Sequence, residues 1–72
     1  MTVKEFYNVV SARSCVDIDL FEGDVYVPIG GAWEAKVLFV KSWNVFQQDV
    51  RVGNTDYMRK KFILHFGLEV KR

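Results

Sequence analysis

Four carboxylates lie close together in the first third of the chain, at Asp17, Asp19, Glu22 and Asp24. Strand alternation places Asp17 and Asp19 on one face with their side chains about 7 Å apart. Two carboxyls at a controlled separation can hydrolyse a glycoside, and several converging oxygens can bind a hard cation. The usual role of such a pair on a hairpin is a solvated face. Among functional roles, the pattern favours an acidic contact surface over metal binding or acid–base catalysis.

Cys15 and His65 are the only cysteine and the only histidine. A catalytic cysteine needs a base and an orienting group, and no local signature accompanies either residue. The sequence favours Cys15 as a small buried hydrophobe. It favours His65 as a partly exposed strand residue, or as one satisfied by a neighbour such as Glu69 or Asp49. One cysteine excludes an internal disulfide, and one Cys with one His excludes a Cys/His zinc site.

The Gly30-Gly31 pair lacks the spacing and the lysine of a phosphate-binding loop, so a bend in the chain is its simplest interpretation. With no nucleophile, metal or cofactor motif, we predict a chain that is not an enzyme and binds no metal or cofactor.

The basic cluster Arg59-Lys60-Lys61 belongs to a strongly asymmetric charge distribution. Residues 1–24 carry a net charge of −3, residues 25–50 are balanced, and residues 51–72 carry +4. The basic end suits nucleic-acid binding, with Tyr26, Trp43 or Tyr57 stacking on bases. The net charge of only +1 argues against it. The alternative is a solvated strand end that protects a sheet edge.

Length and composition indicate one domain over residues 1–72, half of it hydrophobic and 15% aromatic. No apolar run approaches the roughly 18 residues of a membrane span, and the first residues do not form a secretory signal. We therefore expect a cytoplasmic globular protein. Trp33, Phe39, Trp43 and Phe46 lie close together in the sequence, and we expect at least two of them in the core. Any that stay exposed would form a patch suited to protein association.

The N-terminal half predicts a helix and a hairpin. Thr2 and Glu5 form a capping-box pattern for a helix over residues 2–11. Strict alternation predicts a strand over 15–21, a turn at 22–24 and a second strand over 25–29, with Val25, Val27 and Ile29 inward. Pro28 places this second strand at a sheet edge.

The second half of the chain is less regular. Residues 32–41 fit a strand better than a helix, because β-branched and aromatic residues are poor helix formers. Ser42 is a candidate cap for one helical turn through Gln48, and a short strand follows over 49–52. Turn residues at 53–56 lead to a final strand ending at Val70, in which Gly67 indicates a bulge or a close neighbour.

The sum is an α+β fold: a short N-terminal helix packed on a curled, mostly antiparallel sheet of about five strands, or an open barrel. Its predicted core holds one helix residue and six strand residues: Phe6, Val16, Ile18, Leu20, Leu64, Phe66 and Leu68.

The segments Thr2–Phe6 and Val16–Gly23 resemble the start of many small uncharacterised proteins encoded by bacterial phages, prophages and mobile elements. The resemblance covers about the first 25 residues. It implies a phage or mobile-element origin and no catalytic residues.

These patterns predict a non-enzymatic protein-binding accessory or inhibitor module that acts by occlusion or assembly with a partner protein. Two alternatives stay open: a nucleic-acid-binding protein that uses the basic C-terminal third, and a homo-oligomer that pairs an edge strand. The candidate partner-binding residues are Asp17, Asp19, Glu22, Asp24, Tyr26, Trp43, Tyr57, Arg59, Lys60 and Lys61.

Overall fold

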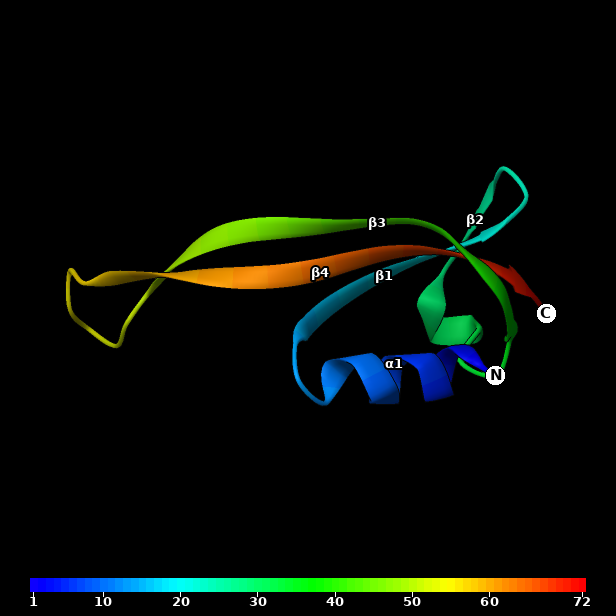
Figure 1. Ribbon diagram of the computed structural model, residues 1–72, viewed down its shortest axis with the longest axis horizontal. Helices are drawn as coiled ribbons and strands as arrows, with labels where there is room; N and C mark the ends of the chain where they lie inside the picture. The colour runs from blue at the N-terminus through cyan, green and yellow to red at the C-terminus, as the bar shows by residue number, and fades with distance from the viewer.

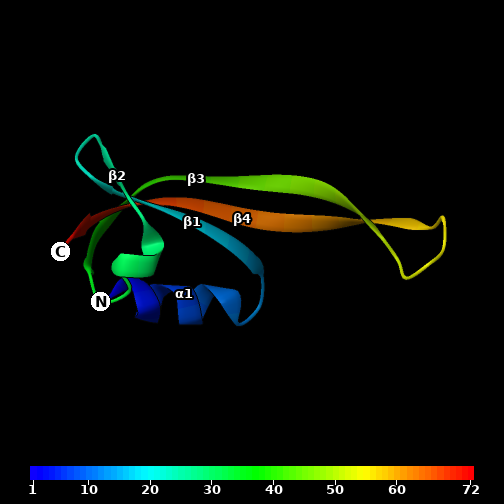
Figure 2. The same ribbon diagram turned by 180° about the vertical axis from the view of Figure 1, so that it is seen from behind.

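A computed structural model describes all 72 residues as one short helix on a four-stranded mixed sheet that is not closed (Figures 1 and 2). The elements are α1 (Val3–Ser11), β1 (Cys15–Glu22), β2 (Val25–Val27), η1 (Ile29–Gly31), β3 (Lys36–Arg51) and β4 (Met58–Lys71). The sheet order is β2-β1-β4-β3. The α+β class is confirmed, whereas the expected number of strands, about five, is wrong and no barrel forms.

The helix begins as its sequence predicts. The Thr2 side chain accepts a hydrogen bond from the backbone N–H of Glu5, and the Glu5 side chain accepts one from the backbone N–H of Thr2. These reciprocal bonds satisfy two donors that a helix N-terminus leaves unpaired. The segment around α1 is also tied to residues 33–37, because the N–H of Val3 donates to the carbonyl of Ala35 over 3.0 Å.

The capping box makes helix stability sensitive to acid. Hydrogen bonds from Thr2 hold the pKa of Glu5 below its ordinary value of 4.5. A lowered pKa stabilises the fold above the ordinary value, and this contribution is lost as the pH falls through the folded-state pKa. We expect thermal melts of the native chain and of Glu5→Gln to differ at about pH 6 and to converge once the pH has fallen below the lowered folded-state pKa of Glu5. A difference that persists or grows in acid would contradict this role of Glu5.

The core lies between α1 and the C-terminal halves of β1 and β4. Ile18, Leu20 and Leu68 are buried as predicted, and Phe6 meets Phe66 edge-on at 5.2 Å between ring centroids. Phe6, Val16 and Phe66 are half-buried against this core, and Leu64 is half-buried as well. The other buried apolar residues are Val3, Val27, Ala32, Ala35 and Val70.

The central strand pair is parallel. β1 lies beside β4 in parallel from Cys15 opposite Ile63 to Phe21 opposite Glu69, while β1–β2 and β3–β4 are antiparallel. The predicted hairpin of β1 and β2 is confirmed at the edge of the sheet. Pro28 ends β2 after three residues, and η1 replaces the rest of the expected strand. Val25, expected to face inward, is 64% exposed because α1 does not reach that end of the sheet.

The middle of the chain differs most from its prediction. The helical turn expected at 42–48 is absent, and one strand runs unbroken from Lys36 to Arg51. The separate strand expected at 49–52 is the end of this β3. Pairing with β4 decides the outcome, because every residue from Ser42 to Arg51 has a partner there. The turn at 53–56 is confirmed.

Bulges shape the first part of β3. The register with β4 shifts between Val37 and Phe39 and again between Val40 and Ser42. The second shift leaves Lys41 unpaired in the ladder, and its ammonium bonds to the Gly23 carbonyl at 2.8 Å and lies 3.4 Å from the Glu69 carboxylate. Gly67 is a close neighbour as predicted, because a Cβ there would stand 2.6 Å from the Ser42 Oγ.

Candidate interaction surface

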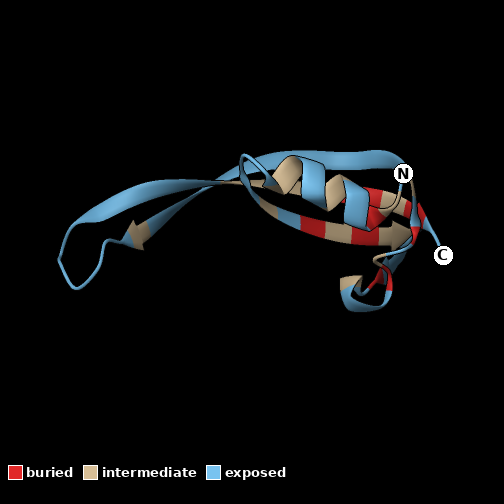
Figure 3. Ribbon diagram, turned by 90° about the horizontal axis from the view of Figure 1, so that it is seen from below, coloured by how far each residue is buried: buried red, intermediate tan, exposed pale blue.

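The hairpin of β3 and β4 carries most of the exposed apolar surface. Fourteen large hydrophobic residues are exposed, and ten of them belong to this hairpin or its turn: Leu38, Phe39, Val40, Trp43, Val45, Phe46, Val52, Tyr57, Met58 and Phe62. No residue between Ala35 and Gly67 is buried. Figure 3 shows burial confined to the body, with the far part of the hairpin almost wholly exposed.

The far part of this hairpin is a two-stranded arm. β1 ends its pairing with β4 at Ile63, so β4 residues 58–62 pair only with Gln47–Arg51 of β3. We call residues 47–62 the arm. It projects beyond α1 and gives the molecule extents of 45 × 22 × 18 Å (Figure 1). A lone two-stranded hairpin is at best marginally stable in water, so the arm is a segment that gains from a partner.

The two faces of the hairpin differ in what surrounds them. Phe66 points toward α1, and its register neighbour Trp43 lies on the same face, which we call the helix face. An exposed apolar strip of Val40, Trp43, Val45 and Phe62 follows this helix face from the body to the base of the arm. Trp43 and Phe62 are the most exposed of the four, at 68% and 60%. We call these four residues the helix-face strip.

The expectation that at least two of four clustered aromatics are core is wrong. Phe39, Trp43 and Phe46 are exposed, and Trp33 is half-buried. Trp43 is exposed because α1 is nine residues long and covers only part of the helix face. Phe39 and Phe46 lie on the opposite face of the sheet, which no helix covers. The exposed rings are therefore divided between the two faces of the hairpin.

The basic candidates lie on the arm. Arg59, Lys60 and Lys61 are exposed residues of β4, opposite Val50, Asp49 and Gln48. Strand alternation sends Lys60 to the helix face and Arg59 and Lys61 to the other face. The cluster is therefore divided between the two sides of the arm.

The acidic candidates do not gather into one surface. Asp17 and Asp19 share the face of β1 that points away from α1, whereas alternation sends Glu22 to the other face. The Asp19 Oδ2 lies 2.8 Å from the His65 Nε2, and Glu22 forms an ion pair with Arg72. Asp24 is exposed in the β1–β2 turn. Two of the four carboxylates thus already have partners within the chain.

The aromatic candidates are separated as well. Tyr26 lies on β2 at one edge of the sheet and packs edge-on against Phe21 at 6.0 Å. Trp43 lies on β3 at the opposite edge, and Tyr57 precedes β4 at the end of the arm. All three are more than half exposed. Trp43 and Tyr57 can share one partner along the hairpin, whereas Tyr26 is remote from both in the sheet.

Cys15 and His65 lie on the same face of the sheet, and the partner of the imidazole is Asp19. Cys15 is exposed at the start of β1, so its interpretation as a buried hydrophobe is wrong. The imidazole of His65 is hydrogen-bonded to Asp19, because the parallel pairing brings β1 beside β4. The neighbours expected from the sequence are Glu69 and Asp49. No three His, Cys, Asp or Glu residues group as metal ligands.

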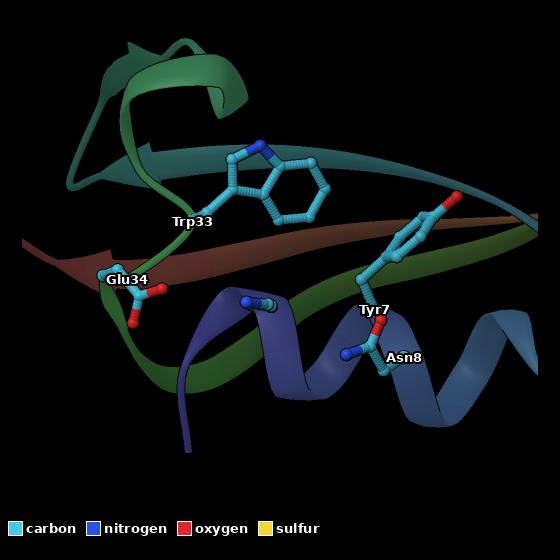
Figure 4. A pocket seen from close by; sticks show the side chains of 5 residues that line it. Tyr7, Asn8, Trp33 and Glu34 are labelled. Atoms are coloured by element: carbon cyan, nitrogen blue, oxygen red, sulfur yellow. The ribbon is translucent and has the colours of Figure 1, made fainter.

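Two hollows lie beside the N-terminal helix and the η1 turn, away from the arm. The larger holds about 390 Å³ and is lined by Lys4, Tyr7, Asn8, Trp33 and Glu34 (Figure 4). The Tyr7 and Trp33 rings meet edge-on there at 5.5 Å. The smaller holds about 220 Å³ beside Ala32 and Arg72. Both are wide open, and neither contains a candidate residue from the sequence.

Comparisons with known proteins complete the description of this surface. No family model, curated protein or solved structure matches the chain. Its single α-helix is too short to cross a membrane. The surface of β3 and β4 is therefore interpreted on its own geometry.

Proposed function

We propose that this chain is a non-enzymatic protein-binding module and that the hairpin of β3 and β4 is its binding element. The observation that carries the proposal is that ten large apolar residues are exposed on a hairpin whose buried apolar residues are only Leu68 and Val70, at the body end of β4. Apolar patches of this kind on a small protein are typical of interaction sites.

The surface area supports the proposal quantitatively. A compact monomer of this mass exposes about 4,600 Å². The chain exposes 5372 Å², an excess of roughly 750 Å² over that compact value. A standard protein–protein interface takes about 800 Å² from each partner. The Cα radius of gyration of 14.5 Å also exceeds the value of about 11 Å for a compact domain of this length.

The chemistry of the partner follows from the helix face. The helix-face strip is apolar, and farther along the arm the same face presents Lys60 and Arg51 beside Asp49. The complementary surface is an apolar patch bordered by carboxylates. A ribbon of two strands fits such a groove and blocks it, which makes occlusion of a partner's site the simplest mode of action.

A pair of matched double variants tests the proposal in affinity capture from cells that encode the chain. Trp43→Ala with Phe62→Ala removes the most exposed rings of the helix-face strip. Val25→Ala with Tyr26→Ala removes comparably exposed residues from the opposite edge. A binding hot spot costs about 2 kcal/mol or more on truncation, which is a loss of about 30-fold. We expect that loss for the first pair only. Equal losses for both pairs would contradict the assignment to the hairpin.

Nucleic-acid binding is the second candidate, and the position of the basic cluster favours it. Arg59, Lys60 and Lys61 lie on a two-stranded ribbon, a shape that a DNA major groove admits. Such binding falls steeply with salt because it releases counterions. Micromolar or tighter binding of a DNA or RNA duplex or single strand at physiological salt, abolished when the three residues become Gln, would replace the first proposal.

Two predictions from the sequence stand beside this proposal. The phage or mobile-element origin that residues 1–25 imply, and the cytoplasmic location expected from composition, stay predictions.

A further inference from the structure

The outer edge of β3 has a partner only at its first residues. In the order β2-β1-β4-β3, β4 pairs with one side of β3. On the other side Lys36 forms a bridge with Thr2, and the N–H of Val37 donates to the carbonyl of Met1 at 2.9 Å. Beyond these residues the outer side leaves backbone N–H and C=O groups free up to Arg51. An unpaired edge of this length is a template on which another strand can pair.

Protection of this edge is confined to its first part. Both register shifts fall before Ser42, and this part carries Lys36 and Lys41. Bulges and lysines are the devices by which proteins prevent edge pairing. From Ser42 to Arg51 the register with β4 is regular, and the segment contains no proline, glycine or lysine.

The opposite edge, β2, is three residues long and ends at Pro28. Two shorter free edges remain: residues 15–19 of β1, which carry Asp17 and Asp19, and residues 58–62 of β4, which carry three consecutive basic residues. The regular half of β3 is thus the longest free edge of the sheet.

A second copy of this chain fits this edge. Residues 42–51 carry only Asp49 and Arg51 as charges, so two such segments meet without net repulsion. β1 and β2 lie on the far side of β4 from this edge, and the N-terminal residues bond to β3 only at Lys36 and Val37, away from residues 42–51 (Figure 1). A nucleic acid gains little from this edge, because the segment carries no net charge. A second copy of the strand can pair with all the free N–H and C=O groups of the first.

We propose that two copies of this chain pair antiparallel through residues 42–51 of β3, about a two-fold axis normal to the sheet near Val45–Gln47. The pairing forms a continuous eight-stranded sheet. It also brings both helices and both helix-face strips to one side of the sheet. The inference concerns the backbone edge of β3 and does not depend on the partner protein proposed above.

Sedimentation equilibrium of the purified chain is the first test. The expected result is a reversible dimer with twice the 8.4 kDa chain mass. Consecutive N–H groups of a strand point to opposite sides, one toward β4 and the next toward the outer edge. Proline has no N–H, so one of the variants Asn44→Pro and Val45→Pro loses a donor on the outer edge, and the other loses a hydrogen bond to β4. The outward variant is expected to keep the circular dichroism of the native chain and to be a monomer. A native chain that is monomeric up to millimolar concentration, or a dimer that survives in both proline variants, would overturn the proposal.

Cysteine scanning locates the axis even if the proline variants unfold. Five variants each carry a single cysteine, at one of the residues 44–48, in a Cys15→Ser background. Together they sample every position near the expected axis. Only the residue on the axis faces its own copy at about 5 Å between Cα atoms, within disulfide range. Every other position is displaced from its own copy by at least about 7 Å along the strands. We expect one of Val45, Phe46 and Gln47 to form a disulfide dimer far faster than its neighbours. Equal rates at all five positions, or none, would contradict the pairing.

Discussion

A chain in which Asn-Gly replaces residues 47–62 is expected to stay folded, to lose dimerisation and to bind its partner more weakly. Phe46 and Ile63 are direct partners in the ladder, so a two-residue turn can join them. No buried residue lies in the removed segment. Its loss therefore leaves the packing of Leu20 against Leu68 and the contact of Phe6 with Phe66 intact.

Thermal melting and binding measured on the same sample test this expectation. The midpoint is expected to stay within about 5 °C of the native value, a change of about 1 kcal/mol for a domain of this size. The dimer is expected to fall below detection, because only residues 42–46 of the regular β3 edge remain. Partner binding is expected to weaken, because Phe62 is removed from the helix-face strip while Val40, Trp43 and Val45 stay. An unfolded shortened chain would show that the arm belongs to the fold rather than to an interface.

Leu68→Ala is expected to unfold much of the population. Leu68 is fully buried between its neighbours Leu20 and Val40 on the helix face. Truncation of a buried leucine costs about 2–5 kcal/mol. The total stability of a domain of this length is about 4–11 kcal/mol, so this single change removes a large part of it.

Phe62→Ala is the matched control for this variant. Phe62 lies on the same strand and the same face but is 60% exposed on the arm. We expect Phe62→Ala to change the free energy of unfolding by less than about 1 kcal/mol, measured by urea denaturation. If the two variants lose equal stability, the arm is packed in solution and the separation between core and arm is wrong.

Local signals account for the parts of the fold that the sequence predicts. The capping box of Thr2 and Glu5 and the alternation of residues 15–21 act over a few residues, so α1 and β1 begin where their patterns place them. Pro28 likewise ends β2 and marks an edge through its own missing N–H.

The parts that the sequence analysis missed depend on distant residues. Ser42 matches a helix cap by type, but Ser42–Arg51 is a strand because β4, up to 25 residues away, pairs with it. The parallel alignment of β1 with β4 also joins segments far apart in the chain, and it gives His65 the partner Asp19. No local pattern contains either pairing.

The sequence predicts that some aromatic residues are exposed, but it does not predict where on the fold they lie. The count of aromatics indicates that a chain this small cannot bury them all, and the exposed ones are Tyr26, Phe39, Trp43, Phe46, Tyr57 and Phe62. Trp43 and Phe62 are exposed because α1 stops short of them on the helix face. Tyr26, Phe39 and Phe46 lie on the opposite face, which no helix covers. The acidic residues are scattered because strand alternation and the turn divide the cluster at 17–24 between two faces and a turn.

Whether residues 42–51 of β3 serve association rather than folding is tested most directly by amide hydrogen exchange of these residues at increasing protein concentration. Outward N–H groups of β3 have no partner within one chain, so they are expected to exchange freely in dilute solution and to gain protection as dimers form. The amides of Leu20 and Leu68 are expected to stay protected throughout. Protection of every amide from Ser42 to Arg51 at a concentration where the chain is monomeric would contradict the account, as would free exchange at every concentration.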